Sequence, residues 1–154
     1  MNDNWIKQSA IDRLVELVIK AERLERLNIS DSTMGTEGVL LLVKALQQNP
    51  LLGKSLKYFS CNYNEVESAK VSKRILDMLV AFEALELVEF KGNTIGRKAA
   101  LEYVAKFEEK GCKLVMFDEE EEEDEEAEEE EDEEEAEEGA EEEELLKKLE
   151  KLKL

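Results

Sequence analysis

Hydrophobic residues recur along the chain in two distinct patterns as far as Phe117. In four short segments apolar and polar residues alternate, which is typical of a strand with one buried face. Between these segments apolar residues recur every three or four positions, as on the buried face of a helix. The patterns predict strands near 26–29, 57–60, 87–90 and 114–117, and helices near 5–21, 36–48, 67–83 and 97–110. Thr36 is predicted to cap the second helix, and Gly111 to end the fourth.

One unit of this pattern repeats along the chain. Counted from Leu24 and from Leu85, residues of the same chemical type stand at offsets 3, 5, 8, 10, 14, 18 and 22. A copy that starts at Leu56 matches at the first four offsets, and its later positions slip by one residue. The starts are 32 and 29 residues apart, and another 29 residues leads to Leu114. This self-similarity predicts a row of stacked strand–helix units.

The pattern L-x-x-L-x-L-x-x-N-x-L followed by a helix resembles the leucine-rich repeat, and its long period resembles the ribonuclease-inhibitor type. The resemblance implies an α/β solenoid of about three to four repeats, with a parallel sheet on the concave side and helices outside. Asn64 and Asn93, at offset 8, are predicted to form a structural asparagine ladder that binds open backbone groups. Cys61 is predicted to be a core residue and Cys112 to be inert, because the chain has no histidine to activate a thiol.

The first predicted helix has no strand before it. Leu14 and Val18 nevertheless precede Leu24 in nearly the same register in which Tyr103 and Phe107 precede the last strand. We expect either a capping helix or the C-terminal part of a longer array, and the sequence favours the two interpretations equally. In the second case the open N-terminal end of the solenoid allows self-association.

Charge divides the chain into three parts. The formal net charge is -19, and 23 of the 27 residues from 118 to 144 are Asp or Glu. Repulsion between these charges predicts a disordered acidic tail over 118–144. Residues 1–117 are then the leucine-rich repeat domain, and residues 145–154 form a short Leu/Lys segment.

Composition also excludes several classes of function. The absence of histidine excludes histidine-based catalysis and most zinc sites. No apolar run approaches the roughly 18 residues of a membrane span, and the acidic balance argues against a nucleic-acid partner. The sequence contains no nucleophile–base pair, phosphate loop or metal cluster. We therefore predict a binding protein without cofactor or metal, in a reduced intracellular setting, rather than an enzyme.

Repeats of this type followed directly by a long Glu-rich run resemble the Ran GTPase-activating protein (RanGAP) family. The resemblance is carried by Leu24–Leu46, Leu85–Phe107, the last strand Leu114–Phe117 and the acidic run from Asp118. It implies binding of a Ran-type small GTPase, support of GTP hydrolysis without a donated arginine, and a role in nucleocytoplasmic transport. The family's catalytic asparagine lies in earlier repeats, so no catalytic residue is assigned here. The family role implies a cytoplasmic location, with shuttling or residence at the nuclear periphery.

Loops in which strands pass into helices are the predicted contacts for the GTPase. Among their residues, exposed Tyr63 and Lys91 are the leading candidates on chemistry alone. The complete candidate set is Asp31, Thr33, Asn62, Tyr63 and Lys91.

Two other interpretations remain open. The acidic leucine-rich nuclear phosphoproteins also join a small repeat domain to an acidic tail, which would make this chain a binder of histones or other basic proteins through 118–144. Their repeats are shorter than the spacings of 32 and 29 seen here. The third interpretation is a fragment with no activity of its own.

The last ten residues contain a further pattern. Leu146, Leu149, Leu152 and Leu154 follow the spacing L-x-x-L-x-x-L-x-L, which resembles a leucine-rich nuclear export signal. Such a spacing can place four leucines in one groove of a receptor. Leucines at helical spacing are more often a packing face, and the alternative is that the segment docks on the exposed end of the solenoid while its lysines pair with the acidic run.

Overall fold

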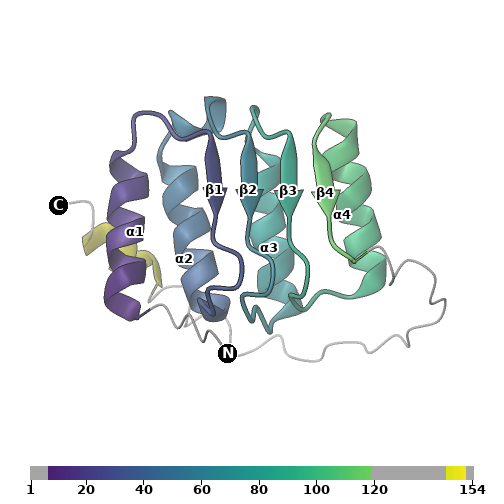
Figure 1. Cartoon of the computed structure of the whole chain (residues 1–154), viewed down its shortest axis with the longest axis horizontal. Coiled ribbons are helices and arrows are strands. Elements are labelled where there is room, and N and C mark those ends of the chain that lie inside the picture. Colours follow the sequence, from purple (N-terminus) through teal and green to yellow (C-terminus); the bar gives the residue numbers. More distant parts are fainter. Residues whose placement is uncertain (1–6, 119–144, 152–154) are drawn as a thin grey trace.

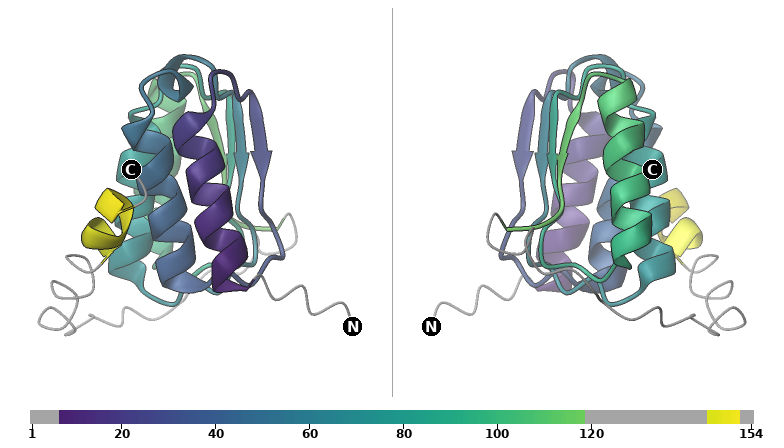
Figure 2. Two further views of the ribbon diagram at one scale, coloured as in Figure 1. Left: turned by 90° about the vertical axis from the view of Figure 1, so that its left-hand side faces the viewer. Right: turned by 90° about the vertical axis from the view of Figure 1, so that its right-hand side faces the viewer.

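The computed structural model describes residues 7–118 and 145–151, and it shows a parallel sheet with helices against one face (Figure 1). In chain order the elements are α1 (Gln8–Lys20), β1 (Arg26–Asn28), α2 (Gly35–Gln48), the 3-10 helix η1 (Leu52–Lys54), β2 (Tyr58–Ser60), α3 (Ala69–Val80), β3 (Leu87–Glu89), α4 (Arg97–Glu109) and β4 (Lys113–Val115). The four strands lie side by side in the order of the sequence, and each is parallel to the next. Both side views in Figure 2 place α1 to α4 on the same side of this sheet.

The predicted α/β organisation is confirmed, with small differences at the ends of the elements. Each strand has three residues, one fewer than predicted, and β4 begins one residue earlier than predicted; register pairs such as Glu89↔Val115 mark the last pairing. The prediction that Gly111 ends the fourth helix is also confirmed. Gly111 has φ 75°, its N–H bonds the carbonyl of Glu108 at 2.9 Å, and the N–H of Cys112 bonds that of Phe107 at 3.0 Å. These two bonds form a Schellman motif.

The predicted cap of the second helix is wrong. Helix α2 begins at Gly35, and its N-cap residue is Met34, whose side chain makes no capping hydrogen bond. Thr36 lies inside the first turn, where its Oγ1 accepts a hydrogen bond from the backbone N–H of Glu67 at 3.0 Å. The hydroxyl therefore joins two successive units instead of closing its own helix.

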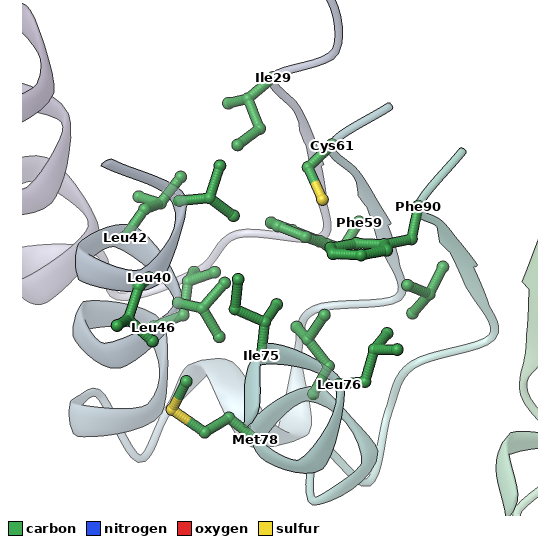
Figure 3. Close-up of a cluster of buried hydrophobic side chains, with 14 of the residues drawn as sticks. Ile29, Leu40, Leu42, Leu46, Phe59, Cys61, Ile75, Leu76, Met78 and Phe90 are labelled. Carbon is green, nitrogen blue, oxygen red and sulfur yellow. The ribbon is translucent and has the colours of Figure 1, made fainter. Parts of the chain in front are cut away.

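The core lies between the sheet and the helices. Residues at offsets 3 and 5 of the repeat point into it, and Phe59, Cys61, Val88 and Phe90 are fully buried. Figure 3 shows Phe59 and Phe90 opposite the aliphatic side chains of α2 and α3. This one-sided burial explains the alternation seen in the sequence, because every second strand residue faces the helices.

Helix α1 packs on α2, and within residues 7–118 no strand precedes it. Ile11, Val15 and Val18 are its buried residues, and a Cβ at Gly38 of α2 would lie 3.1 Å from Cδ1 of Ile11. Glycine therefore allows the close approach of the two helices. The amide of Asn49, after α2, donates to the carbonyls of Val18 at 2.9 Å and Ala21 at 2.8 Å. These bonds satisfy carbonyls that the end of a helix leaves open.

Residues 145–151 form a further helical segment on the outer side of the helix layer, away from the sheet (Figure 2). Most of the predicted tail, residues 119–144, and Leu152 and Leu154 of the export pattern lie outside the described residues. Among the described helices, none has the length and apolar character needed to cross a membrane.

Candidate functional site

The strand-to-helix loops form a continuous edge of the molecule. Parallel pairing continues past the strand ends, so that the N–H of Asp31 bonds the carbonyl of Asn62 at 2.9 Å and the N–H of Tyr63 bonds that of Lys91 at 2.8 Å. Successive loops are thereby held in register, one on top of the next. Side chains at equivalent offsets are brought together although about 30 residues separate them.

Two asparagines hold this edge from the inside. Asn93 Oδ1 accepts from the N–H groups of Asn64 and Val66, both at 3.2 Å, and its Nδ2 donates to the carbonyl of Cys61 at 3.0 Å. Asn64 repeats the arrangement one unit earlier, accepting from Met34 N at 3.2 Å and donating to the carbonyl of Ile29 at 2.8 Å. The predicted structural role of both residues is confirmed. Their side chains pair backbone groups that would otherwise lack partners in each turn.

The backbone of the edge has positive φ at repeated positions. Offset 7 is occupied by Asp31, Tyr63 and Gly92, with φ of 55°, 53° and 69°. Thr33 and Glu65, at offset 9, have φ of 46° and 58°. Positive φ is unfavourable for a β-branched or bulky residue such as Thr33 or Tyr63, and it persists only where the surrounding structure imposes it. The stacked hydrogen bonds of the loops supply that restraint.

Two of the predicted contact residues converge on one carboxylate. The Tyr63 hydroxyl donates to Oδ2 of Asp118 at 2.6 Å, and Lys91 Nζ donates to Oδ1 of the same residue at 2.7 Å. The ring of Tyr63 lies over Gly92, where any Cβ would clash with it. We call Tyr63 and Lys91, with Gly92 beneath them, the carboxylate clamp.

The hydrogen bonds of the clamp favour the charged forms of Asp118 and Lys91. The hydrogen bond from Lys91, followed by that from Tyr63, lowers the pKa of Asp118 below its ordinary value. The hydrogen bond to Asp118 raises the pKa of Lys91. The side chains of Lys91 and Asp118 are 25% and 46% exposed, so the pair remains accessible to solvent and to a competing ligand.

The remaining predicted contacts differ in their placement. Asp31 is exposed on the same edge, and Thr33 is half-buried beside it. Asn62 is buried, and its Oδ1 accepts the backbone N–H of Lys91 at 2.7 Å. The structure thus gives Asn62 a role in holding the loops, which corrects the prediction that its side chain is a partner contact. A polar residue at the loop surface can turn inward when an unpaired N–H lies beneath it.

Two features of the surface were missed in the sequence. Asp118 was assigned to the acidic run, and only its position directly after the last strand indicated that it could return to the loops. On the sheet face away from the helices, the guanidinium of Arg26 lies 4.3 Å from the centre of the Tyr58 ring, and the Tyr58 hydroxyl donates to Glu89 at 2.6 Å. The alternation placed these three residues on one face, but the cross-strand register needed the structure.

Both cysteines belong to the core. Cys61 is completely buried, and burial raises the pKa of its thiol far above the ordinary value. Burial, with the nearby charge of Glu86, raises the pKa of Cys112 to about 11. Neither thiol is ionised at neutral pH, so neither supplies a nucleophile. Within residues 7–118 and 145–151, no three His, Cys, Asp or Glu residues are grouped so as to hold a metal ion.

A comparison with known protein families finds no match, and a search of curated proteins finds no similar sequence. The function must therefore be inferred from the chain's own residues.

Proposed function

We propose that this chain is a protein-binding module built on a leucine-rich repeat solenoid of the ribonuclease-inhibitor type, and that its partner is a Ran-type small GTPase. The convergence of Tyr63 and Lys91 on one carboxylate is the observation that carries the proposal. A tyrosine and a cation held rigidly on a loop edge are typical of energetically important interface residues.

Three structural features support the solenoid part of the proposal. Each strand is followed by a helix on the same side of a parallel sheet, and strand order equals chain order. The asparagines at offset 8 bind the backbone of the neighbouring turn. Residues at offsets 18 and 22, such as Leu42 and Leu46, are fully buried.

A GTPase that binds at this edge would place one of its own carboxylates where Asp118 now lies. Because Asp118 is part of the same chain, it competes at high effective concentration, on the order of millimolar for a short tether. The partner must displace it, so binding should be weaker than the contacts alone would give. Activation of GTP hydrolysis should be small or absent, because no residue here corresponds to the family's catalytic asparagine.

Titration of the full chain with the GTP-bound and GDP-bound GTPase tests this proposal. We expect Lys91→Met and Tyr63→Phe to weaken binding of the GTP form by about fivefold or more, which corresponds to one lost interfacial contact of about 1 kcal/mol. Lys73→Met, on the exposed side of α3, is the matched control. Equal affinity of all variants, or no binding by any of them, would reject the clamp as a GTPase contact. Single-turnover hydrolysis in the same samples should show little stimulation.

The second candidate function is binding of a basic protein through 118–144. It is favoured by the density of carboxylates in that run. Affinity for a histone should then fall steeply with salt and should not respond to Lys91→Met. A response to Lys91→Met with little salt dependence would instead favour the loop edge.

We also infer that Leu146, Leu149, Leu152 and Leu154 act as an export signal that keeps the protein in the cytoplasm. The spacing of the four leucines supports this inference.

A further inference from the structure

The helical segment 145–151 has one buried face. Leu145 and Leu149 stand four residues apart, on the same side of a helix, and are 7% and 0% exposed. Leu146 points elsewhere and is 41% exposed. This contrast between adjacent leucines shows that the segment lies against the protein with a defined orientation.

Helix α2 supplies independent evidence of the same contact. Every residue of α2 from Gly38 to Leu46 is buried, whereas α3 and α4 bury residues only at helical spacing. A helix with a sheet beneath it and a helix on each side still has one outer face for solvent. On α2 that face is covered as well, and residues one turn apart on it, Leu40 and Lys44, are 4% and 5% exposed. Figure 2 shows the segment on this outer side of the layer.

An ion pair sets the position of the segment along α1. Lys148 Nζ lies 3.6 Å from Oδ1 of Asp12, and both side chains are partly exposed. Lys148 follows Leu145 by three residues, so the lysine and the two buried leucines form one amphipathic surface. The contact is therefore that of an amphipathic helix docked through its apolar face, with an ion pair at its edge.

We propose that residues 145–151 form an intramolecular latch on the outer face of α1 and α2, and that the latch masks the export pattern from its receptor. Leu149 belongs to the export pattern and is completely buried in the docked state. A receptor groove and the α1–α2 face cannot hold this side chain at the same time. The receptor therefore binds only the undocked fraction, and its apparent affinity is reduced by that fraction.

The occupant of this face is the chain's own segment. It is seated there in the structure, and residue 118 at the other end of the run 119–144 is held in the carboxylate clamp. Because the segment is covalently joined to the domain on which it docks, its effective concentration at this face is higher than that of a separate chain. Anything that pulls on the acidic run, such as a basic protein bound to it, would favour release.

The two functions of the segment are separable by mutation. Leu145 is buried in the docked state and stands outside the export pattern, while Leu146 belongs to the pattern and is exposed when docked. Leu145→Asp should release the latch and leave the pattern complete. Leu146→Asp should damage the pattern and leave the latch closed, and it is the matched control because it places the same charge on the neighbouring residue.

The proposal rests on the export role inferred above, so the test reads docking and export separately in the full chain. Amide hydrogen exchange of 145–151 reports docking, and Leu145→Asp should accelerate it by about tenfold or more, with Leu146→Asp near wild type. The same variants, fused to a tandem fluorescent protein too large to diffuse through nuclear pores, report export. Leu145→Asp should leave nuclei several-fold faster than wild type, and adding Leu146→Asp should abolish this gain.

Each alternative result has one meaning. Fast exchange of 145–151 in the wild type would overturn the latch. Faster exchange in Leu145→Asp with unchanged export, while Leu146→Asp blocks export, would overturn masking and retain the export role. Faster exchange with no export in any variant would overturn both the export role and its masking, and would leave only the docked helix. The thermal unfolding of each variant checks that the repeat domain remains folded.

Discussion

The loop edge and the outer face of the helix layer hold the two ends of the same acidic run by different means. At the loop edge, one carboxylate is bound by a hydroxyl and an ammonium group, both partly open to solvent. On the outer face, two leucines are buried against the helices, and the Lys148–Asp12 ion pair of 3.6 Å lies beside them. The first contact is directional and electrostatic, and the second is mainly apolar.

This difference determines what each contact can do. Hydrogen bonds to Asp118 select a carboxylate in one position, but exposed ion pairs contribute little to stability. Burial of leucine contributes more free energy and selects shape rather than charge. The loop edge is therefore suited to exchange one acidic ligand for another, and the helix face is suited to hold or release a whole segment.

The largest effect on stability should come from the asparagine ladder that holds the loops of the clamp. Asn93→Ala removes an acceptor for two N–H groups and a donor to the Cys61 carbonyl, so the free energy of unfolding should fall by about 1–3 kcal/mol. Denaturant unfolding measures it. The control is Asn28→Ala, because Asn28 is exposed and its side-chain oxygen accepts a hydrogen bond from the nearby N–H of Ser30; its effect should stay within about 0.5 kcal/mol. If Asn93→Ala and the wild type unfolded at the same denaturant concentration, the stabilising role of the asparagine ladder would be disproved.

On the helix face, Leu149→Ala should lower the free energy of unfolding by no more than about 2 kcal/mol. The ceiling is lower than for a central core leucine, because the segment can undock instead of leaving a cavity. Hydrogen exchange should show loss of protection in 145–151 while the strands stay protected. Leu146→Ala, at the exposed neighbour, should change neither quantity. A loss comparable to a central core substitution would mean that the segment is integral to the fold.

High salt should separate the two contacts. At 1 M salt the screening length is about 3 Å, so the Lys91–Asp118 pair should loosen. The buried leucines should stay docked, because apolar burial is not screened. Chemical shifts of Asp118 and Leu149, followed in one salt titration, measure both contacts. Parallel loss of the two would contradict the division into a polar and an apolar anchor.

Acid should have the smallest and most local effect. The pKa of Asp118 is lowered in the folded chain, so the clamp contributes fully above the ordinary aspartate range, near pH 4, and is lost as pH falls through the lowered value. An NMR titration of the Asp118 carboxyl carbon measures this value. Lys91→Met should raise this pKa, because the hydrogen bond from Lys91 is the largest cause of its lowering. Leu149 should stay buried over the same range unless the domain itself unfolds.

The elements could be predicted from the sequence because each depends on local spacing. Alternation located the four strands, and apolar positions four residues apart located the helices. The inward turn of Asn64 and Asn93 was also predictable, since each strand end leaves backbone groups that an amide can pair. Tyr63 and Lys91 could be named as candidate partner contacts because of their residue types and their position in the strand-to-helix loops.

What the tertiary structure decided was which groups meet across long separations. Tyr63 and Lys91 reach the same carboxylate because the stacked loops bring offset 7 of one unit and offset 6 of the next beside Asp118, three residues after β4. Thr36 bonds the next unit instead of its own helix for the same reason.

The last ten residues show most clearly how far the sequence alone can determine the structure. Their spacing by itself established an amphipathic leucine pattern, which both an export signal and a packing face satisfy. Only the tertiary structure distinguished Leu145 and Leu149, which are buried, from Leu146, which is exposed. The reason is physical, because a helical pattern specifies which side chains share a face but not which surface that face will find.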